Sequence, residues 1–207
     1  TTALQAALDA ARTYDVAIWI PGATYKTTAT LTWHATVASW GRPIRIRGDG
    51  SRKTIIKLYG ATNTPVLSVK GNGVSGGSND ITHGYVKDIG LAQNSGTGNI
   101  GLRIQGVSYT TFLGIEASNF TSGNGIEIYQ TGGTGDSDLV GLCTFQDIFV
   151  HNNMNGLAVN AVASFMAFVQ CRLINVYAQS NTANNFLLSN FDGIELIKCL
   201  AIGSNIS

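Results

Sequence analysis

The stretch CTFQDIFVHNN, residues 143–153, is followed by CRLINVYAQSN at 171–181 and by CLAIGSNIS at 199–207. Each segment begins with a cysteine, and the cysteines are 28 positions apart. A fixed period between about 20 and 50 residues is typical of a solenoid, in which each repeat buries its apolar side against its neighbours. The repeat therefore predicts a chain wound through equivalent coils, with three cysteines stacked as small packing residues: Cys143, Cys171 and Cys199.

The repeated segments have the alternation of β-strands. Apolar positions recur at spacings of 26, 33 and 28, at Ile89, Ile115, Ile148 and Val176. Around Ile115, the neighbouring Glu116 and Ser118 take the opposite face from the apolar residues, which is the period of a strand with one buried face. A second alternating strand follows in each coil, beginning at Gly101, Gly125, Gly156 and Asn185.

Short strands joined by Asn-rich or Gly-rich bends are typical of a parallel β-helix. The Leu and Asn order of leucine-rich repeats is absent, and nothing between the strands has a helical period. We expect an all-β fold in one domain over 1–207, with N-terminal strands and first coils at 16–84 and regular coils at 85–207, the last of them incomplete.

Residues 1–15 predict a different element. Thr2 and Gln5 have capping-box spacing, and Leu4, Leu8 and Ala11 share one helical face. A short amphipathic α-helix is expected here, capping the open core at the end of the solenoid.

Composition excludes several classes of protein. The 207 residues are 44% hydrophobic and 12% charged, which is enough apolar material for a sizeable core. The net charge is +1 without a stripe of Lys or Arg, so a nucleic-acid partner is not expected. No apolar run reaches the roughly 20 residues of a membrane span, and the N-terminus lacks the order of a signal peptide.

The blocks ALQAALDAA, VAIWIPGATY and IRIRGDGSRKTIIKL, followed by coils such as GIEASNFTSGNGIEI, resemble the pectate-lyase-like right-handed β-helix superfamily. Within it the likeness is greatest to phage tailspike and tail-fibre depolymerases. The resemblance implies a polysaccharide partner bound along an outer face, a homotrimer, and a place on a virion tail or outside the cell. Because the chain starts at the helix and ends in mid-coil, we expect it to be a fragment.

Outward positions of successive coils form ladders in which catalytic groups can be sought. One column reads Gly90, Glu116, Phe149, Tyr177, the column before it Asp88, Gly114, Asp147, Asn175, and the column after it Ala92, Ser118, His151, Gln179. Glu116 and Asp147 are expected about 8 Å apart at Cα, which permits carboxyl separations of about 5 to 9.5 Å, the range for glycoside hydrolysis.

Two chemistries remain open for this face. In hydrolysis, Glu116 and Asp147 act as acid and base while Phe149 and Tyr177 stack on sugar rings. In β-elimination, His151 or Tyr177 moves the proton. Arg172 and Lys198 then neutralise a uronate, and Asn175 lies beside them on the substrate face. The alternative is a solvated sheet face carrying an aromatic cross-strand pair.

Two other features are less informative. The insertion at 131–141 contains Asp136 and Asp138, two carboxylates, which are too few to predict a Ca²⁺ site, so no cofactor is expected. Arg103 and Glu127 occupy equivalent positions of the second strand and predict a surface ion pair.

The leading functional hypothesis is a phage-type depolymerase that cleaves bacterial surface glycan by hydrolysis or β-elimination. The alternative is a non-catalytic glycan-binding module or structural stalk of a viral or cell-surface fibre.

Overall fold

The computed structural model describes residues 2–35, 43–71, 81–130, 139–161, 168–203 and 205–206. Within these residues the chain forms one short helix, α1 (Thr2–Tyr14), and many short strands. All strand pairs in the described residues are parallel. The protein is therefore an all-β fold built from parallel sheets. No helix in the described part of the chain is long and apolar enough to cross a membrane.

Four sheets contain these strands. The twelve-stranded sheet consists of β1 (Ile18–Trp19), β2 (Ala23–Thr27), β4 (Arg45–Arg47), β5 (Thr54–Leu58), β9 (Tyr85–Lys87), β10 (Gly90–Gln93), β14 (Thr111–Leu113), β15 (Glu116–Ser118), β18 (Thr144–His151), β21 (Arg172–Gln179), β24 (Glu195–Ile197) and β25 (Leu200–Ile202). The seven-stranded sheet consists of β3 (Leu31–His34), β7 (Pro65–Lys70), β12 (Ile100–Gln105), β16 (Asn124–Gln130), β19 (Asn155–Ala161), β22 (Asn184–Leu187) and β26 (Asn205–Ile206).

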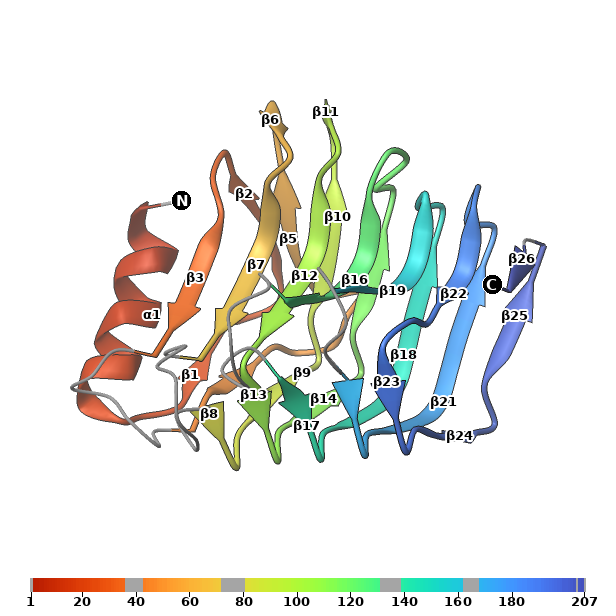
Figure 1. The fold of residues 1–207 in the computed structure, drawn as a ribbon. Coiled ribbons are helices and arrows are strands. Elements are labelled where there is room, and N and C mark those ends of the chain that lie inside the picture. Colours follow the sequence, from red (N-terminus) through yellow and green to blue (C-terminus); the bar gives the residue numbers. More distant parts are fainter. Residues whose placement is uncertain are drawn as a thin grey trace.

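Two smaller sheets complete the set. The five-stranded sheet consists of β8 (Ile81–Thr82), β13 (Val107–Ser108), β17 (Val140–Gly141), β20 (Phe168–Val169) and β23 (Phe191–Asp192). The two-stranded sheet consists of β6 (Ala61–Thr62) and β11 (Gly96–Thr97). Figure 1 shows equivalent strands side by side in chain order, from α1 at the red end to β25 and β26 at the blue end.

The core lies between the sheets and is filled by inward columns of apolar side chains. Leu67, Leu102, Ile126 and Leu157 form one column across β7, β12, β16 and β19, and each is essentially fully buried. Each such burial contributes about 1.5 to 3 kcal/mol. Because a column is continued only by the next passage of the chain, the passages stabilise one another.

The predicted register of the outer columns is confirmed. Gly90 pairs with Glu116, Glu116 with Phe149, and Phe149 with Tyr177. On the seven-stranded sheet Arg103 pairs with Glu127. The alternation of apolar and polar residues is sufficient for this result, because a slip of one residue would turn every side chain to the wrong face.

The predicted cysteine column is correct for two members and wrong for the third. Cys143 and Cys171 are both buried, and the Cys143 backbone N–H donates to Cys171 Sγ at 3.4 Å. Cys199 instead precedes Leu200, which pairs with Tyr177, so Cys199 neighbours Val176. The last passage is offset by 23 positions rather than 28, because the connection from β22 to β23 is shorter than the one from β19 to β20.

The column predicted to read Asp88, Gly114, Asp147 and Asn175 is a bend in the strand. Its members have φ between 53° and 61°, in the left-handed region that Asp, Asn and Gly adopt most readily. At Gly114 an added Cβ would also lie 2.9 Å from Asp88 Oδ1. The residue types of this column therefore reflect backbone conformation.

The predicted N-terminal helix is present and lies across the end of the sheets (Figure 1). Leu8 and Ala11 of this helix are buried against the core. The capping-box role expected for Gln5 is replaced by a contact with the edge strand β3. Gln5 Nε2 donates to the Thr32 carbonyl at 3.0 Å, and the Thr32 N–H donates to Gln5 Oε1 at 2.8 Å. The helix thus satisfies edge groups that would otherwise invite another strand.

Candidate functional site

The outer face of the twelve-stranded sheet is hollowed where two small residues interrupt its columns. Gly90 and Ala92 on β10 lie between Ile55 and Lys57 on β5 and the next passage at β15. The resulting depression, here called the Glu116 hollow, has a volume of about 250 Å³. Its lining includes Thr24, Ser51, Lys57, Glu116, Ser118 and Asn119. The volume is below the roughly 300–1,000 Å³ of drug-sized pockets and suits a single small ring or a unit of a chain.

Besides leaving space for the hollow, Gly90 allows the backbone of another segment to approach closely. A Cβ on Gly90 would lie 2.1 Å from the Ser51 carbonyl oxygen. The connection between β4 and β5 therefore passes directly over Gly90, which brings Ser51 and Arg52 to the rim.

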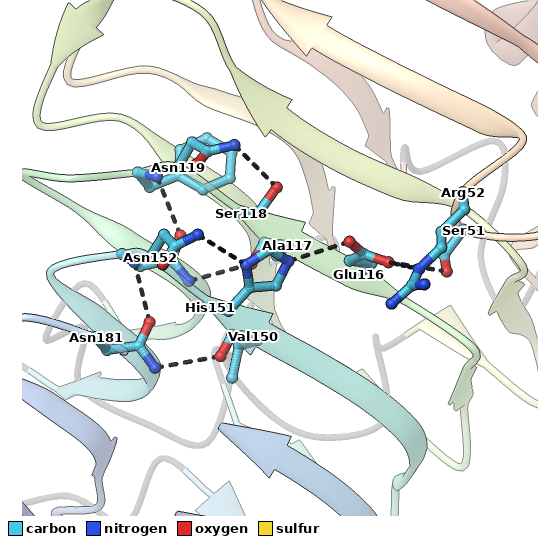
Figure 2. Close-up of polar contacts among 12 residues, drawn as sticks. Ser51, Arg52, Glu116, Ala117, Ser118, Asn119, Val150, His151, Asn152 and Asn181 are labelled. Carbon is cyan, nitrogen blue, oxygen red and sulfur yellow. Dashed lines mark hydrogen bonds and ion pairs between the residues drawn. The ribbon is translucent and has the colours of Figure 1, made fainter. Parts of the chain in front are cut away.

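Glu116 is the centre of the polar contacts at the hollow (Figure 2). Arg52 Nε donates to Glu116 Oε2 at 3.2 Å, and the Ser51 hydroxyl donates to the same oxygen at 3.4 Å. His151 Nε2 lies 3.1 Å from Glu116 Oε1. The Glu116 side chain is 19% exposed. Three donors thus surround a carboxylate that solvent and ligand still reach.

His151 is held in one orientation by its other neighbours. Asn152 Nδ2 lies 3.1 Å from His151 Nδ1, so an amide N–H is available to this nitrogen. A neutral ring accepting from Asn152 and donating from Nε2 to Glu116 satisfies both contacts. The Phe149 ring stacks on His151, with centroids 4.3 Å apart. Glu116 and His151 therefore form a positioned acceptor and donor pair.

An aromatic column continues from this pair toward the C-terminal strands. The Phe149 and Tyr177 rings are 5.3 Å apart at their centroids, and Leu200 follows Tyr177 in the same column. These half-buried and exposed side chains give the face an apolar strip beside the hollow. Such a strip suits the C–H faces of sugar rings as well as cross-strand packing.

Buried asparagines fix the end of β15 and β18, and with it the position of His151. Asn153 Oδ1 accepts from the Phe120 N–H at 3.0 Å, and Asn153 Nδ2 donates to the Ala117 carbonyl at 3.1 Å. Asn181 repeats both contacts one passage later, with Asn153 and Val150 (Figure 2). The Asn-rich bends of the sequence are therefore a ladder that satisfies buried backbone groups.

The structure brings together only part of the predicted site. Glu116, His151, Phe149 and Tyr177 form one continuous group, as described above. Asp147 is exposed at the bend, where Asn175 Nδ2 donates to Asp147 Oδ1 at 2.5 Å and Gln146 Nε2 donates to Oδ2 at 3.2 Å. No contact joins Asp147 to Glu116 within the described residues.

The two predicted cationic residues lie on later passages of the chain, away from Glu116. Arg172 Nε pairs with Glu195 Oε2 at 2.9 Å, on two exposed side chains. Lys198 is exposed at the bend equivalent to Asn175, with φ of 52°. Neither residue lines the Glu116 hollow.

No pattern in the sequence pointed to Ser51 or Arg52. They contact Glu116 across 65 and 64 positions, from a connection that has no counterpart in the repeated coils. The Gly-Asp-Gly turn at 48–50 marked a tight connection, but only the fold places that connection over Gly90.

Metal ligation finds little support in the residues that the structure describes. No group of three or more His, Cys, Asp or Glu residues is arranged to hold an ion there. Asp136 and Asp138, the pair considered for Ca²⁺, lie outside the described residues.

No protein-family model matches the chain, and no curated protein sequence matches it. Among solved structures the chain is similar to the ORF18 protein of Geobacillus virus E2, with 13% identical residues and a TM-score of 0.46. The similarity covers 100% of this chain and 58% of the viral protein, so the chain spans less than two thirds of that protein's length.

Proposed function

We propose that the chain is a polysaccharide-acting parallel β-helix protein, a depolymerase of the kind carried on phage tails, and that glycan binds at the Glu116 hollow. The observation that carries the proposal is the combination of this hollow, the Glu116–His151 pair and the Phe149–Tyr177 column on one face. An extended sugar chain needs such a shallow, open track more than it needs a closed pocket.

The parallel β-helix is the architecture that best accounts for the sheet topology. Strands of the seven-stranded sheet pair in chain order, β3, β7, β12, β16, β19, β22 and β26, and the strands between them lie in the other sheets. A chain that returns to each sheet in the same direction after each passage follows a helical path. The resemblance of the N-terminal block to pectate-lyase-like proteins agrees with this path.

Glu116 is the residue we assign to proton transfer. With Arg52 and His151 on its two oxygens it is held in place as a hydrogen-bond acceptor. In hydrolysis Glu116 serves as the base or nucleophile and Asp147 of the next passage as the acid. In β-elimination Glu116 takes the C5 proton of a uronate while His151 holds Glu116 in place. The bond to the leaving oxygen then breaks, and Tyr177 donates a proton to that oxygen.

The further setting of the protein is also a proposal. We place it on a virion tail or outside the cell, acting on bacterial surface glycan as a homotrimer, on the strength of the likeness to tailspike and tail-fibre depolymerases.

A second function, glycan binding without cleavage, has one observation in its favour. Among the residues lining the hollow, Glu116 is the one carboxylate, and Asp147 is committed to Asn175 and Gln146. A single carboxylate paired with Arg52 is as suitable for accepting sugar hydroxyls as for catalysis.

Release of new reducing ends from bacterial capsular and plant uronate polysaccharides tests the proposal. Glu116→Gln should lower the rate by about 100-fold or more, the usual contribution of a positioned acid or base. Asp192→Asn is the matched control, because Asp192 is exposed on the five-stranded sheet away from the hollow. Equal rates for the wild type and Glu116→Gln would refute the catalytic role, and binding without product would favour the second function.

A further inference from the structure

A second hollow lies on the same sheet, among the strands nearest to α1. Its volume is about 440 Å³, and its lining includes Trp19, Arg47, Asp49 and Tyr85. These residues come from three neighbouring strands, β1, β4 and β9, and from the connection that follows β4. Trp19 pairs with Arg47, and Arg47 pairs with Lys87, so one aromatic and two cationic side chains form a row across β1, β4 and β9.

Trp19 is exposed and yet fixed in place. Trp19 is 62% exposed, whereas Trp33 is buried in the core. Its indole Nε1–H donates to Asp49 Oδ1 at 2.8 Å, and Asp49 Oδ2 accepts from the Gly22 N–H at 2.7 Å. A rigidly held, exposed indole offers a flat apolar face to a ligand at little cost in side-chain entropy.

The charge around this ring is positive. Arg47 is exposed and has no carboxylate within ion-pair distance among the described residues. Lys87, next to Arg47 in the column, lies 4.7 Å above the Tyr85 ring. The one carboxylate in the lining, Asp49, has each of its oxygens engaged by a donor, and the positive charges of Lys53 and Arg47 act on it.

One short connection joins this hollow to the first. In the segment 48–53, Asp49 orients Trp19, while Ser51 and Arg52 contact Glu116. The two hollows therefore border the same segment, and a ligand that contacts both must cross it.

We infer that the Trp19 hollow is an accessory binding site for a negatively charged sugar unit of an extended glycan, with the ring stacked on Trp19 and the anionic group at Arg47. This inference rests on the proposed glycan function, since it extends the ligand beyond the Glu116 hollow. A pyranose presents a C–H face to an indole, and a guanidinium is well suited to carboxylate and sulfate groups.

Binding to defined polymers tests the site directly. Calorimetric titrations with oligogalacturonate, dextran sulfate and unsubstituted dextran should be made in a Glu116→Gln background, in which cleavage is expected to be at least about 100-fold slower. We expect binding of at least one of the two anionic polymers, which identifies a carboxylate or a sulfate as the preferred group, and no binding of dextran. Trp19→Ala should weaken binding by about tenfold and Arg47→Gln by about threefold.

Two controls keep the result specific. Phe191→Ala removes another aromatic side chain, 48% exposed on β23 of the five-stranded sheet, and should leave affinity unchanged. Trp19→Phe keeps a ring but loses the bond to Asp49, and should fall between the wild type and Trp19→Ala. Equal affinity for dextran, or no loss in Trp19→Ala, would overturn the accessory site.

The two proposals fail in different ways. If Glu116→Gln abolishes cleavage while Trp19→Ala binds normally, the depolymerase proposal stands and the accessory site is wrong. If no glycan is cleaved but anionic polymers bind through Trp19, the accessory site stands and the catalytic role is wrong.

Discussion

Glu116 and Glu127 lie on successive strands, β15 and β16, and both are outward residues paired with an arginine of an earlier passage. Arg52 Nε is 3.2 Å from Glu116, and Arg103 Nε is 2.7 Å from Glu127. Each carboxylate has two further side-chain neighbours, Ser51 and His151 for Glu116, and Asn124 and Asn160 for Glu127. Yet the Glu116 side chain is 19% exposed and the Glu127 side chain 3%.

The difference lies in the neighbours on the sheet. Glu116 faces the dip left by Gly90 and Ala92, whereas Glu127 is enclosed by Arg103 and two asparagine amides. A hydrogen-bonded carboxylate on an outer face is therefore not by itself a candidate catalytic group. The carboxylate must also be accessible to a ligand. By this criterion the twelve-stranded sheet, with Glu116, has an open face, and the seven-stranded sheet, with Glu127, has a closed one.

The comparison predicts unequal losses of stability on removal of the two carboxylates. Glu127→Ala leaves Arg103 without its partner in a largely buried setting and should lower the free energy of unfolding by about 3 kcal/mol. Glu116→Ala removes a pair whose arginine is exposed and should cost less than about 1 kcal/mol. Urea unfolding followed by circular dichroism measures both.

A double substitution separates the ion pair from simple packing. Arg103→Met with Glu127→Met replaces both charges by apolar groups of similar length and should recover part of the stability lost in Glu127→Ala. A loss in Glu116→Ala as large as that in Glu127→Ala would remove the distinction between the two faces.

The hollow itself offers the next prediction. Ala92→Leu places a larger side chain on the floor of the Glu116 hollow without requiring a change in the backbone. This variant should reduce glycan affinity by about tenfold. Ala10→Leu on the exposed face of α1 is the matched control for added apolar surface. Affinity measured by calorimetry should fall only in the first variant, with little change in the thermal midpoint of either.

The sequence alone was sufficient to predict which residues lie on much of this open face and which of them are neighbours. Alternation with a period of two fixed which residues point outward, and the spacing of Ile115, Ile148 and Val176 fixed which of them are neighbours. Both signals are local and are repeated in successive passages. The same repeat misplaced Cys199, because equal cysteine spacing concealed a shorter connection before β24.

What the sequence could not predict depends on contacts outside the repeat. Arg103 and Glu127 were expected as a surface ion pair; the pair is confirmed, but the burial of Glu127 is set by Asn124 and Asn160. Arg52 reaches Glu116 only because the connection after β4 passes over Gly90. Neither contact leaves a periodic signal.

The two faces should also differ in their response to pH. On the closed face, burial lowers the pKa of His34, and the positive charges of Lys70 and Arg12 lower it further. The unfolded chain therefore binds a proton at His34 more readily, and stability should fall as pH drops from about 7 through the folded-state pKa. In His34→Gln this part of the pH dependence of the unfolding free energy should be absent. A substitution of the exposed His83 should leave the pH dependence unchanged. An unfolding free energy equally pH-dependent in wild type and His34→Gln would contradict the assignment.

On the open face, hydrogen bonding rather than burial is the cause. The Trp19 indole and the Gly22 N–H, with smaller contributions from Lys53 and Arg47, lower the pKa of Asp49 below 3.8. A carboxylate with a lowered folded-state pKa contributes stability above its unfolded pKa and loses it as pH falls through the folded value. Because Asp49 is exposed, the effect on stability should be small, but Trp19 reports it directly. The fluorescence difference between wild type and Trp19→Phe should change with a midpoint below pH 3.8, and Asp49→Asn should remove the transition. A midpoint at or above 3.8 would mean that Asp49 does not hold the indole in solution, and the fixed ring of the accessory site would lose its support.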